Sequence, residues 1–546
     1  MSQEKLYELG DEVINYIMEV WPVTGTHMGV HERDGKLADL QEEKIGENYQ
    51  QLADYRQQVD AITKENFTLE AEIDQQLLYH NLSSMVRDYE FKENHLRNPN
   101  LYVEEVFGGI MSLLLKDFAP LRERLQSLKE RLADIPRVFE QGEQNLVPAR
   151  IPPVWLEVSL EQLKMAPGLF AQLLPGLVAE HLPEAEDDFR QLGQSAAAAA
   201  EEFSSYLKND AGFKVKGEFA VGEEYFNTLL EENHLVSYNA EELLEIGEEI
   251  FAETKAAMKR QAEKIKPGHN AAKLLEEAKK DHPAAGELLS AYQQAMEETR
   301  EFVIKEQIVN IPEGEELKII ETPPYLRPII PYAAYMQPGI FADDLTGLFL
   351  VTPVDPDADA ELKEEKLKGH FYAKLPITTL HEGYPGHHLQ LSWAAKSGSN
   401  IRKTGSFLST LFVEGWAFYC EELMEDLGYI ADPLQKLSRL ADQLWRAARI
   451  ILDVKLHCQG MSVEDAIDFL VDNCQLERSN ARAEVRRYTS SPTQPQSYLM
   501  GKREILNIIK DYQRRYPNKS LQEMHNEILQ AGSLPPKLLR RHLELE

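Results

Sequence analysis

The feature that most constrains the fold is a spacing of three and four residues between apolar side chains, which recurs through most of the chain. Clear runs are Leu121, Leu125, Leu128 and Leu132, and Ile73, Leu77, Leu78 and Leu82. This spacing places apolar side chains on one face of a helix. It predicts successive amphipathic helices from residue 1 to about residue 210, and further helices over residues 240–310 and from residue 375 to the end.

The pattern changes between residues 308 and 356, where proline is frequent among β-branched and aromatic residues. Within this stretch, Leu317–Ile320 and Gly347–Val351 have the composition of strands. The rest of the sequence shows no comparable strand signal. We therefore predict a mostly α fold that contains one small sheet.

The length of 546 residues exceeds what one hydrophobic core usually supports. We expect an N-terminal helical region over residues 1–210 and a catalytic region over residues 211–546. The two regions could also form one continuous fold with two lobes.

Charge and cysteine content bear on partners and location. The chain has 58 basic and 91 acidic residues, a net charge of −33, which disfavours binding to nucleic acid and to anionic lipid. The first residues lack the pattern of a secretory signal, and no apolar run approaches the ~20 residues of a membrane helix. The three cysteines, Cys420, Cys458 and Cys474, have no paired metal-binding spacing. These features predict a cytoplasmic protein without nucleic-acid or membrane partners.

The strongest chemical signal is the pair His381-Glu382. In zinc hydrolases, the motif His-Glu-x-x-His places two imidazoles one helical turn apart around one ion, and its glutamate acts as general base. The position of the second histidine is occupied here by Pro385, and His387 and His388 follow two residues later. The motif is therefore present in an interrupted form.

Either of these two histidines could be the second ligand. Pro385 should interrupt the helix, because proline lacks a donor and clashes with the preceding turn. In a straight helix, His388 would lie nearly above His381 but ~10 Å along the axis, too far for one ion. His387 would be nearer but would face another direction unless the helix is distorted. We favour His387 and keep His388 as the alternative.

A third ligand is expected from the segment Phe412–Glu422, which reads as a helix. Glu414 in this helix is the candidate ligand. The next residue, Gly415, is costly in a helix unless another element packs closely against it. Glu421 shares the face of Glu414 and is expected to orient a ligand histidine through its second ring nitrogen.

Other candidates lie nearer the C-terminus. The hydroxyls of Tyr488 and Tyr498 could stabilise an oxyanion, with Tyr498 favoured, although tyrosines are often simply packing residues. Arg487 could bind a substrate carboxylate or form a surface ion pair. His457 lies one helical turn after Asp453, so the two could handle protons near the site or form a structural polar pair away from it.

The strand region could also take part in substrate binding. We predict that the stretch containing Gly347 and Phe349 offers a strand edge along which an extended peptide lies. The alternative is a hairpin that only stabilises the core.

Several of these motifs resemble known families. The phrase Glu414-Gly415-Trp416-Ala417-x-Tyr419-x-Glu421 is similar to the third-ligand helix of gluzincin metallopeptidases. Together with residues 381–388, it resembles the bacterial family named domain of unknown function 885. Further matches are Arg449, Asp453, His457, Arg487-Tyr488, Pro492, Gln494-Pro495 and Ser497-Tyr498-x-x-Gly501-Lys502. The resemblance, strong from about residue 210 onward, implies a large helical gluzincin-like fold with one zinc ion beside a small sheet.

These features predict a zinc-dependent hydrolase, in first place a peptidase that acts on peptides or small acyl substrates. Manganese or cobalt could replace zinc on the same ligands. Two alternatives are a hydrolase of non-peptide amides or esters and a non-catalytic binding protein. A di-iron protein would need two Glu-x-x-His motifs, and the sequence offers only the one from Glu231 to His234.

Overall fold

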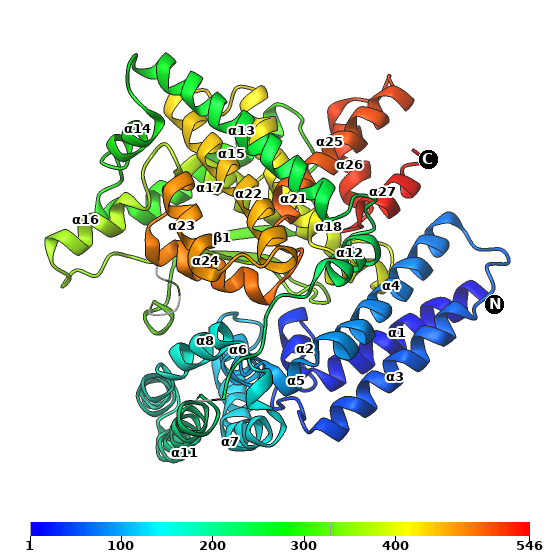
Figure 1. The fold of residues 1–546 in the computed structure, drawn as a ribbon, viewed down its shortest axis with the longest axis vertical. Coiled ribbons are helices and arrows are strands. Elements are labelled where there is room, and N and C mark those ends of the chain that lie inside the picture. The colour runs from blue at the N-terminus through cyan, green and yellow to red at the C-terminus, as the bar shows by residue number, and fades with distance from the viewer. Residues whose placement is uncertain (1, 213, 328–329, 331, 546) are drawn as a thin grey trace. The chain divides into compact units, whose positions relative to one another are not determined.

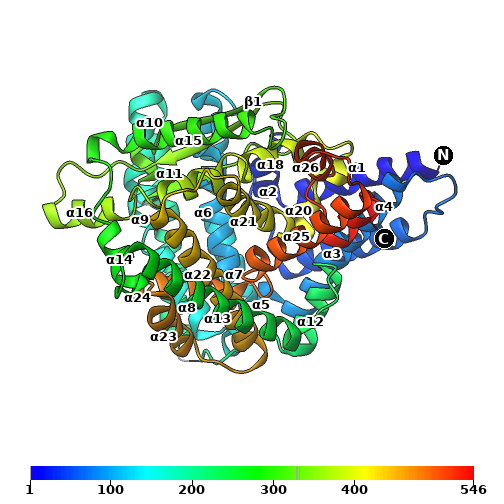
Figure 2. The same cartoon turned by 90° about the horizontal axis from the view of Figure 1, so that it is seen from above.

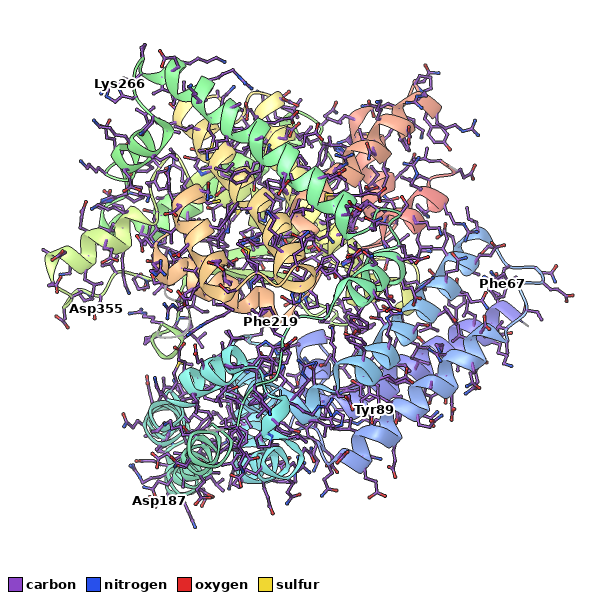
Figure 3. The ribbon with its side chains drawn as sticks, in the orientation of Figure 1. Phe67, Tyr89, Asp187, Phe219, Lys266 and Asp355 are labelled. Atoms are coloured by element: carbon purple, nitrogen blue, oxygen red, sulfur yellow. The ribbon has the colours of Figure 1, made fainter. Side chains whose placement is uncertain are left out.

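A computed structural model describes residues 2–212, 214–327, 330 and 332–545. The chain divides into two compact units. Unit 1 comprises residues 1–67 and 78–219, and unit 2 comprises residues 68–77 and 220–546. Figure 3 labels Phe67 and Phe219, the last residues of the two segments of unit 1.

Unit 1 is built from helices (Figure 1). They are α1 (Ser2–Val20), α2 (Pro22–Met28), α3 (Glu42–Asp60), the larger part of α4 (Leu69–Lys92), α5 (Asn94–Arg97), α6 (Asn100–Leu114), α7 (Leu121–Asn145), η1 (Pro148–Arg150), α8 (Pro153–Leu163), α9 (Ala166–Gly168), η2 (Leu169–Leu173), α10 (Leu174–His181), η3 (Pro183–Ala185), α11 (Glu186–Ser205) and η4 (Tyr206–Ala211). The periodic leucines Leu125, Leu128 and Leu132 are fully buried in α7, as their spacing predicts.

The first turns of α4 belong to unit 2 and are held there by charged contacts. Arg402 donates from Nε to Asp74 at 2.6 Å and from Nη2 to Glu70 at 2.7 Å. His542 contacts the other oxygen of Glu70 at 2.8 Å. The side chains of Arg402 and Asp74 are nearly inaccessible to solvent, so this contact is an internal one within unit 2.

Unit 2 contains the remaining helices and a sheet. The helices are α12 (Glu223–Glu232), α13 (Ala240–Ile265), α14 (Ala271–Ala278), η5 (Ala285–Glu287), α15 (Leu288–Lys305), η6 (Pro324–Leu326), α16 (Ala360–Lys368), α17 (Leu375–Glu382), α18 (His387–Ala395), α19 (Asn400–Lys403), α20 (Gly405–Leu408), α21 (Leu411–Asp426), α22 (Pro433–Cys458), α23 (Val463–Cys474), α24 (Arg478–Ser490), α25 (Ser497–Arg515), α26 (Leu521–Gln530) and α27 (Pro536–His542). Figure 3 marks Lys266, which follows α13, and Asp355, which precedes α16.

The core of unit 2 joins the helices that carry the site. α13 packs along α22, and α21 packs along α25, as both views show (Figures 1 and 2). One cluster of buried apolar side chains comes from α12, α13, α21, α22 and α25; among its members are Phe226, Leu243, Phe418, Ile450 and Leu499. This packing fixes α21, α22 and α25 relative to one another.

The small sheet has three strands in the order β1-β3-β2: β1 (Glu315–Glu321), β3 (Leu345–Val351) and β2 (Ala333–Met336). β3 runs parallel to β1 and antiparallel to β2. Both segments predicted as strands are strands. The prediction of a mostly helical protein with a small sheet is therefore confirmed.

None of the helices in the described ranges combines the length and the hydrophobicity needed to cross a membrane.

Candidate metal centre

The His-Glu segment is broken at the predicted place. Helix α17 ends at Glu382 and helix α18 begins at His387. Between them the chain folds back on the last turn of α17, where the amide of Gly386 donates to the carbonyl of Leu380 at 3.0 Å. A Cβ atom on Gly386 would lie 1.9 Å from the carbonyl oxygen of His381, so only glycine fits this turn. The turn brings the ring of His387 to 4.8 Å from the ring of His381.

Three side chains from α17, α18 and α21 converge at this turn. They are His381, His387 and Glu414, and each offers one ligand atom within 4.8 Å of the other two. His387 Nε2 and Glu414 Oε2 are 3.4 Å apart, which is long for a hydrogen bond. Oε2 of Glu414 is also buried without a hydrogen-bond partner among the described residues. Two imidazoles and a carboxylate are a donor set that suits catalytic zinc, so the residues fit such an ion.

Glu421 lies two turns beyond Glu414 on the same face of α21, and it orients His381. Nδ1 of His381 lies 2.8 Å from Oε1 of Glu421, whose side chain is 1% exposed. If Nδ1 carries the proton and donates it to this carboxylate, Nε2 of His381 is left as the ligand atom. This is the contact that the sequence predicted for Glu421.

The charges in this cluster favour an ionised Glu414. Burial raises the pKa of Glu414, but the close contact with His387 and its charge, the charge of His381 and the hydroxyl of Tyr498 lower the pKa by more, to about 2. Burial lowers the pKa of His387, whereas Glu414 and Glu382 raise it by more, so the pKa of His387 lies above its usual value. The electrostatic effect of Glu382 on His387 shows that the predicted base lies near the centre.

His388 takes no part in this cluster. Its Nε2 lies 2.7 Å from Glu315 on β1, and its Nδ1 lies 3.2 Å from the hydroxyl of Tyr335 on β2. Tyr384 donates to the same oxygen of Glu315 at 2.7 Å. Of the two histidines that the sequence left open, His387 alone lies in the cluster, because the turn before it rotates α18 relative to α17.

The cost of Gly415 in α21 is explained by a close crossing with α25. A Cβ atom on Gly415 would lie 2.3 Å from the backbone of Gly501, and one on Gly501 would lie 2.0 Å from the carbonyl oxygen of Leu411. Each glycine therefore lets the other helix approach. Since Tyr498 precedes Gly501 by one turn and Glu414 precedes Gly415, the crossing also brings Tyr498 to Glu414.

The two candidate tyrosines have different surroundings. Burial and the charge of Glu414 raise the pKa of Tyr498, which keeps its hydroxyl protonated as a donor beside the centre. Tyr488 is fully buried, donates to Glu484 at 2.7 Å and accepts from Arg449 Nε at 3.1 Å. Of the two tyrosines, Tyr498 therefore lies beside the candidate ligands, and the catalytic role of either tyrosine stays a prediction.

His457 and Arg487 lie in neighbouring networks. Nε2 of the buried His457 lies 3.0 Å from the carbonyl of Tyr488 and 3.9 Å from Asp453 on the same face of α22. Arg487 donates to Gln494 at 2.7 Å, and its side chain is 38% exposed. Their catalytic and substrate-binding roles stay predictions.

The peptide-binding edge predicted at Gly347 and Phe349 is wrong. β3 is the central strand, so its backbone groups already pair with β1 and β2. Phe349 is 1% exposed and packs on Tyr292. A Cβ atom on Gly347 would lie 2.7 Å from Nδ1 of His388, so this glycine makes room for the histidine. The sequence did not show the order of the strands, which depends on pairing between distant segments.

Three residues near the site were not predicted from the sequence: Glu315 and Tyr335, which are partners of His388, and Trp445. The two strand residues lie in the proline-rich stretch and make their contacts across more than fifty residues of sequence, so no local spacing could have indicated them. The side chain of Trp445 contacts Arg446 and Arg449 from one helix, and this spacing could have been recognised.

Comparison with known proteins gives a family and a fold. The family described as "bacterial protein of unknown function (DUF885)" matches residues 22–543. A candidate lipoprotein of unknown function from Shewanella oneidensis is 25% identical, with a TM-score of 0.81 over 99% of this chain and 100% of that one. A candidate lipoprotein from Colwellia psychrerythraea has a TM-score of 0.84 at 16% identity, over 100% of this chain and 99% of that one. No curated protein matches the chain.

These similarities contradict the predicted cytoplasmic location. Both similar structures are of candidate lipoproteins, a class anchored to membranes by lipid and found outside the cytoplasm. The three free cysteines misled the prediction: Cys420 is buried and the other two are partly buried. Burial also raises the pKa of each thiol, so unreactive thiols of this kind carry little information about compartment.

Proposed function

The chain belongs to the bacterial family DUF885, whose function is unknown, and we propose that it is a zinc-dependent hydrolase that cleaves peptide bonds. One observation carries this proposal: three ligand atoms of His381, His387 and Glu414 converge at the end of α17, where Glu382 is the adjacent residue. The resemblance of the Glu414–Glu421 helix to gluzincin peptidases supports the same function. We also propose that the protein lies outside the cytoplasm, as the similar candidate lipoproteins do.

Each residue would have a distinct task. His381, His387 and Glu414 would hold the ion, and Glu421 would keep His381 in the correct orientation. A bound zinc ion would polarise the acyl oxygen and make water a stronger acid.

Glu382 would accept the proton of the attacking water and pass it to the leaving amine. The C–N bond breaks, the hydroxyl joins the carbonyl carbon, and the amine leaves with the added proton. Tyr498 would donate a hydrogen bond to the oxygen on which negative charge develops.

Zinc content and peptide cleavage test this proposal together. We expect about one zinc ion per purified chain, and cleavage of a peptide library that stops with a chelator and returns when zinc is restored. The Glu382→Gln variant should retain zinc and lose at least about a hundredfold in turnover, because a base does not hold the ion.

Two outcomes would contradict the proposal. If the protein held no zinc even after incubation with the metal, the proposed metal centre would be wrong. Full activity of Glu382→Gln would remove the assigned base. Cleavage of aryl esters or amides, but of no peptide in the library, would keep the centre and change the substrate class.

A further inference from the structure

One face of α22 presents charged side chains beside the metal centre. Asp442 contacts Lys374, the residue before α17, and lies 3.6 Å from Arg446 Nη1. The charge of His381 also acts on Asp442, which places this face near the candidate ligands. The carboxylate of Asp442 is thus shared by the charged side chains of Lys374 and Arg446.

The next turn of α22 repeats this arrangement with a second shared carboxylate. Glu484 accepts from Arg449 Nη2 and from Arg487 Nη2, each at 3.0 Å. Lys374, Arg446, Arg449 and Arg487 therefore share Asp442 and Glu484, and two positive charges remain uncompensated in these two groups. This excess stands out in a chain with a net charge of −33.

Three donors on this face lack partners. Nε of Arg446, Nη1 of Arg449 and the indole nitrogen of Trp445 are buried, and none has a hydrogen-bond partner among the described residues. Arg449 itself is only 5% exposed. Buried donors are nearly always satisfied in native proteins, so three unsatisfied donors within two turns of one helix indicate a place for a ligand that accepts hydrogen bonds.

Arg449 lies between Trp445, which lines a cavity, and Tyr498, which lies beside the metal centre. Cζ of Arg449 lies 4.3 Å from the ring centroid of Trp445 and 4.5 Å from that of Tyr498. Trp445 lines a cavity of about 750 Å³ together with Lys374 and Asp442, whereas Tyr498 interacts with the candidate ligand Glu414. A ligand group held by these arginines would therefore lie between the cavity and the reacting centre.

We propose that Arg446, Arg449 and Trp445 form a binding site for the terminal carboxylate of a peptide, so that the enzyme removes residues from the C-terminal end of its substrates. This inference rests on the proposed function and names its substrate class. Nη1 of Arg449, Nε of Arg446 and the indole nitrogen of Trp445 can each donate a hydrogen bond to a carboxylate, and the local excess of positive charge suits an anion. The lining of the cavity is otherwise mainly acidic, so it would repel further negative charge on the substrate. Its charged residues, apart from Asp442, are Glu276, Glu361, Glu364, Glu365, Glu477, Lys279, Lys368 and Lys374.

Competition between paired peptides tests the site without depending on turnover. The probe is an equimolar mixture of N-acetylated tetrapeptides, each made as the free acid and as the C-terminal amide. Full-length Glu382→Gln protein loaded with zinc is mixed with the peptides, and the retained peptides are measured by mass spectrometry after rapid ultrafiltration. We expect the acids to be retained about tenfold over their amides, the effect of one charge-assisted contact.

Further variants in the same background identify the residues. Arg446→Gln should bring the ratio of acid to amide close to one, and Arg449→Lys, which keeps the charge but loses the planar guanidinium, should lower it severalfold. The matched control is Arg514→Gln, because the Arg514 side chain is 70% exposed and lies on another helix. Trp445→Phe, which removes only the indole donor, replaces any arginine variant that does not fold, as judged by circular dichroism.

Equal retention of acids and amides would overturn the inference, and so would retention of neither. A preference that survives Arg446→Gln and Arg449→Lys would also overturn it. Failure of the proposed function appears elsewhere, in zinc content and in cleavage by the unmodified chain. Internal cleavage of amidated peptides would support the proposed hydrolase activity and would contradict the proposed carboxylate site.

Discussion

The adjacent residues His387 and His388 of α18 each pair with a glutamate from another element, and the two pairs differ in almost every respect. In the pair His388–Glu315 the two atoms are 2.7 Å apart and the side chains are 0% and 2% exposed. In the pair His387–Glu414 the distance is 3.4 Å and the side chains are 12% and 17% exposed. The first pair has the geometry of a strong hydrogen bond and the second does not.

The partners of the two pairs explain the difference. His388 is engaged at both ring nitrogens, and Glu315 also receives Tyr384 and lies 3.6 Å from Arg300. In the other pair, Nδ1 of His387 and Oε2 of Glu414 have no hydrogen-bond partner among the described residues. We call His388–Glu315 the closed pair, because its hydrogen-bonding groups are engaged, and such a pair stabilises the fold. We call His387–Glu414 the open pair, because its unused donor and acceptor capacity is suited to bind a third group. The comparison therefore separates a structural pair from a candidate metal-binding pair.

The largest expected effect comes from removing one member of the open pair. His387→Ala should lower zinc content from about one ion per chain to near zero after dialysis and abolish turnover, because each ligand of a tetrahedral zinc site accounts for roughly 3 kcal/mol of binding or more. Metal analysis by mass spectrometry measures this. His388→Gln is the matched neighbour and should keep its zinc; the reverse result would break the comparison.

Removing one member of the closed pair should affect stability instead. Glu315→Ala leaves His388 buried without its carboxylate, and we expect a loss of about 3–5 kcal/mol in the free energy of unfolding with zinc still bound. Urea denaturation of the zinc-loaded protein measures the loss. The control is Glu316→Ala on the same strand, whose side chain is 58% exposed and should matter by less than about 0.5 kcal/mol. Equal stability of both variants would show that the closed pair does not support the fold.

A buried histidine without a carboxylate sharpens the comparison through its pH dependence. His525 contacts Tyr419 and the carbonyl of Ile308, and burial lowers its pKa to about 4. The unfolded chain therefore binds a proton near pH 6.5 that the folded chain does not, so stability falls as the pH drops from about 6.5 to about 4, by roughly 3 kcal/mol for this residue. Denaturation between pH 7 and pH 4.5 should show a shallower slope in His525→Gln than in the unmodified chain; identical slopes would contradict the low pKa.

The smallest effect is expected from the carboxylate that orients His381. Glu421→Gln can still contact Nδ1 of His381 but no longer fixes its proton by charge, and we expect zinc affinity to fall about ten- to a hundredfold. Competition with a chromogenic chelator measures this affinity. Glu425→Gln, on the next turn of the same helix, is paired with Arg439 and should leave zinc affinity unchanged. An unchanged affinity in Glu421→Gln would reduce that residue to a packing role.

Local features of the site could be predicted from sequence because they depend on helical spacing. The break after Glu382 follows from Pro385, and the pairing of Glu421 with the candidate ligand His381 follows from its position two turns beyond Glu414. The need for a close neighbour at Gly415 could also be predicted, but the sequence did not indicate which helix would pack there.

Features that depend on long-range geometry could not be predicted. The choice between His387 and His388 is decided by how Gly386 folds against α17, a backbone arrangement that residue types alone do not specify. The central position of β3 depends on strand pairing across a proline-rich stretch. The unsatisfied donors of Arg446 and Arg449 become visible only when every neighbouring acceptor is placed.

The crossing of Gly415 and Gly501 has a consequence for the order in which the candidate site forms. Glu414 meets Tyr498 only after α25 has packed against α21, and α25 is among the last helices to be synthesised. A nascent chain that already displays His381, His387 and Glu414 therefore still lacks the hydroxyl beside them. In the proposed hydrolase, the candidate ligands and the candidate oxyanion donor therefore come together only after α25 has packed on α21.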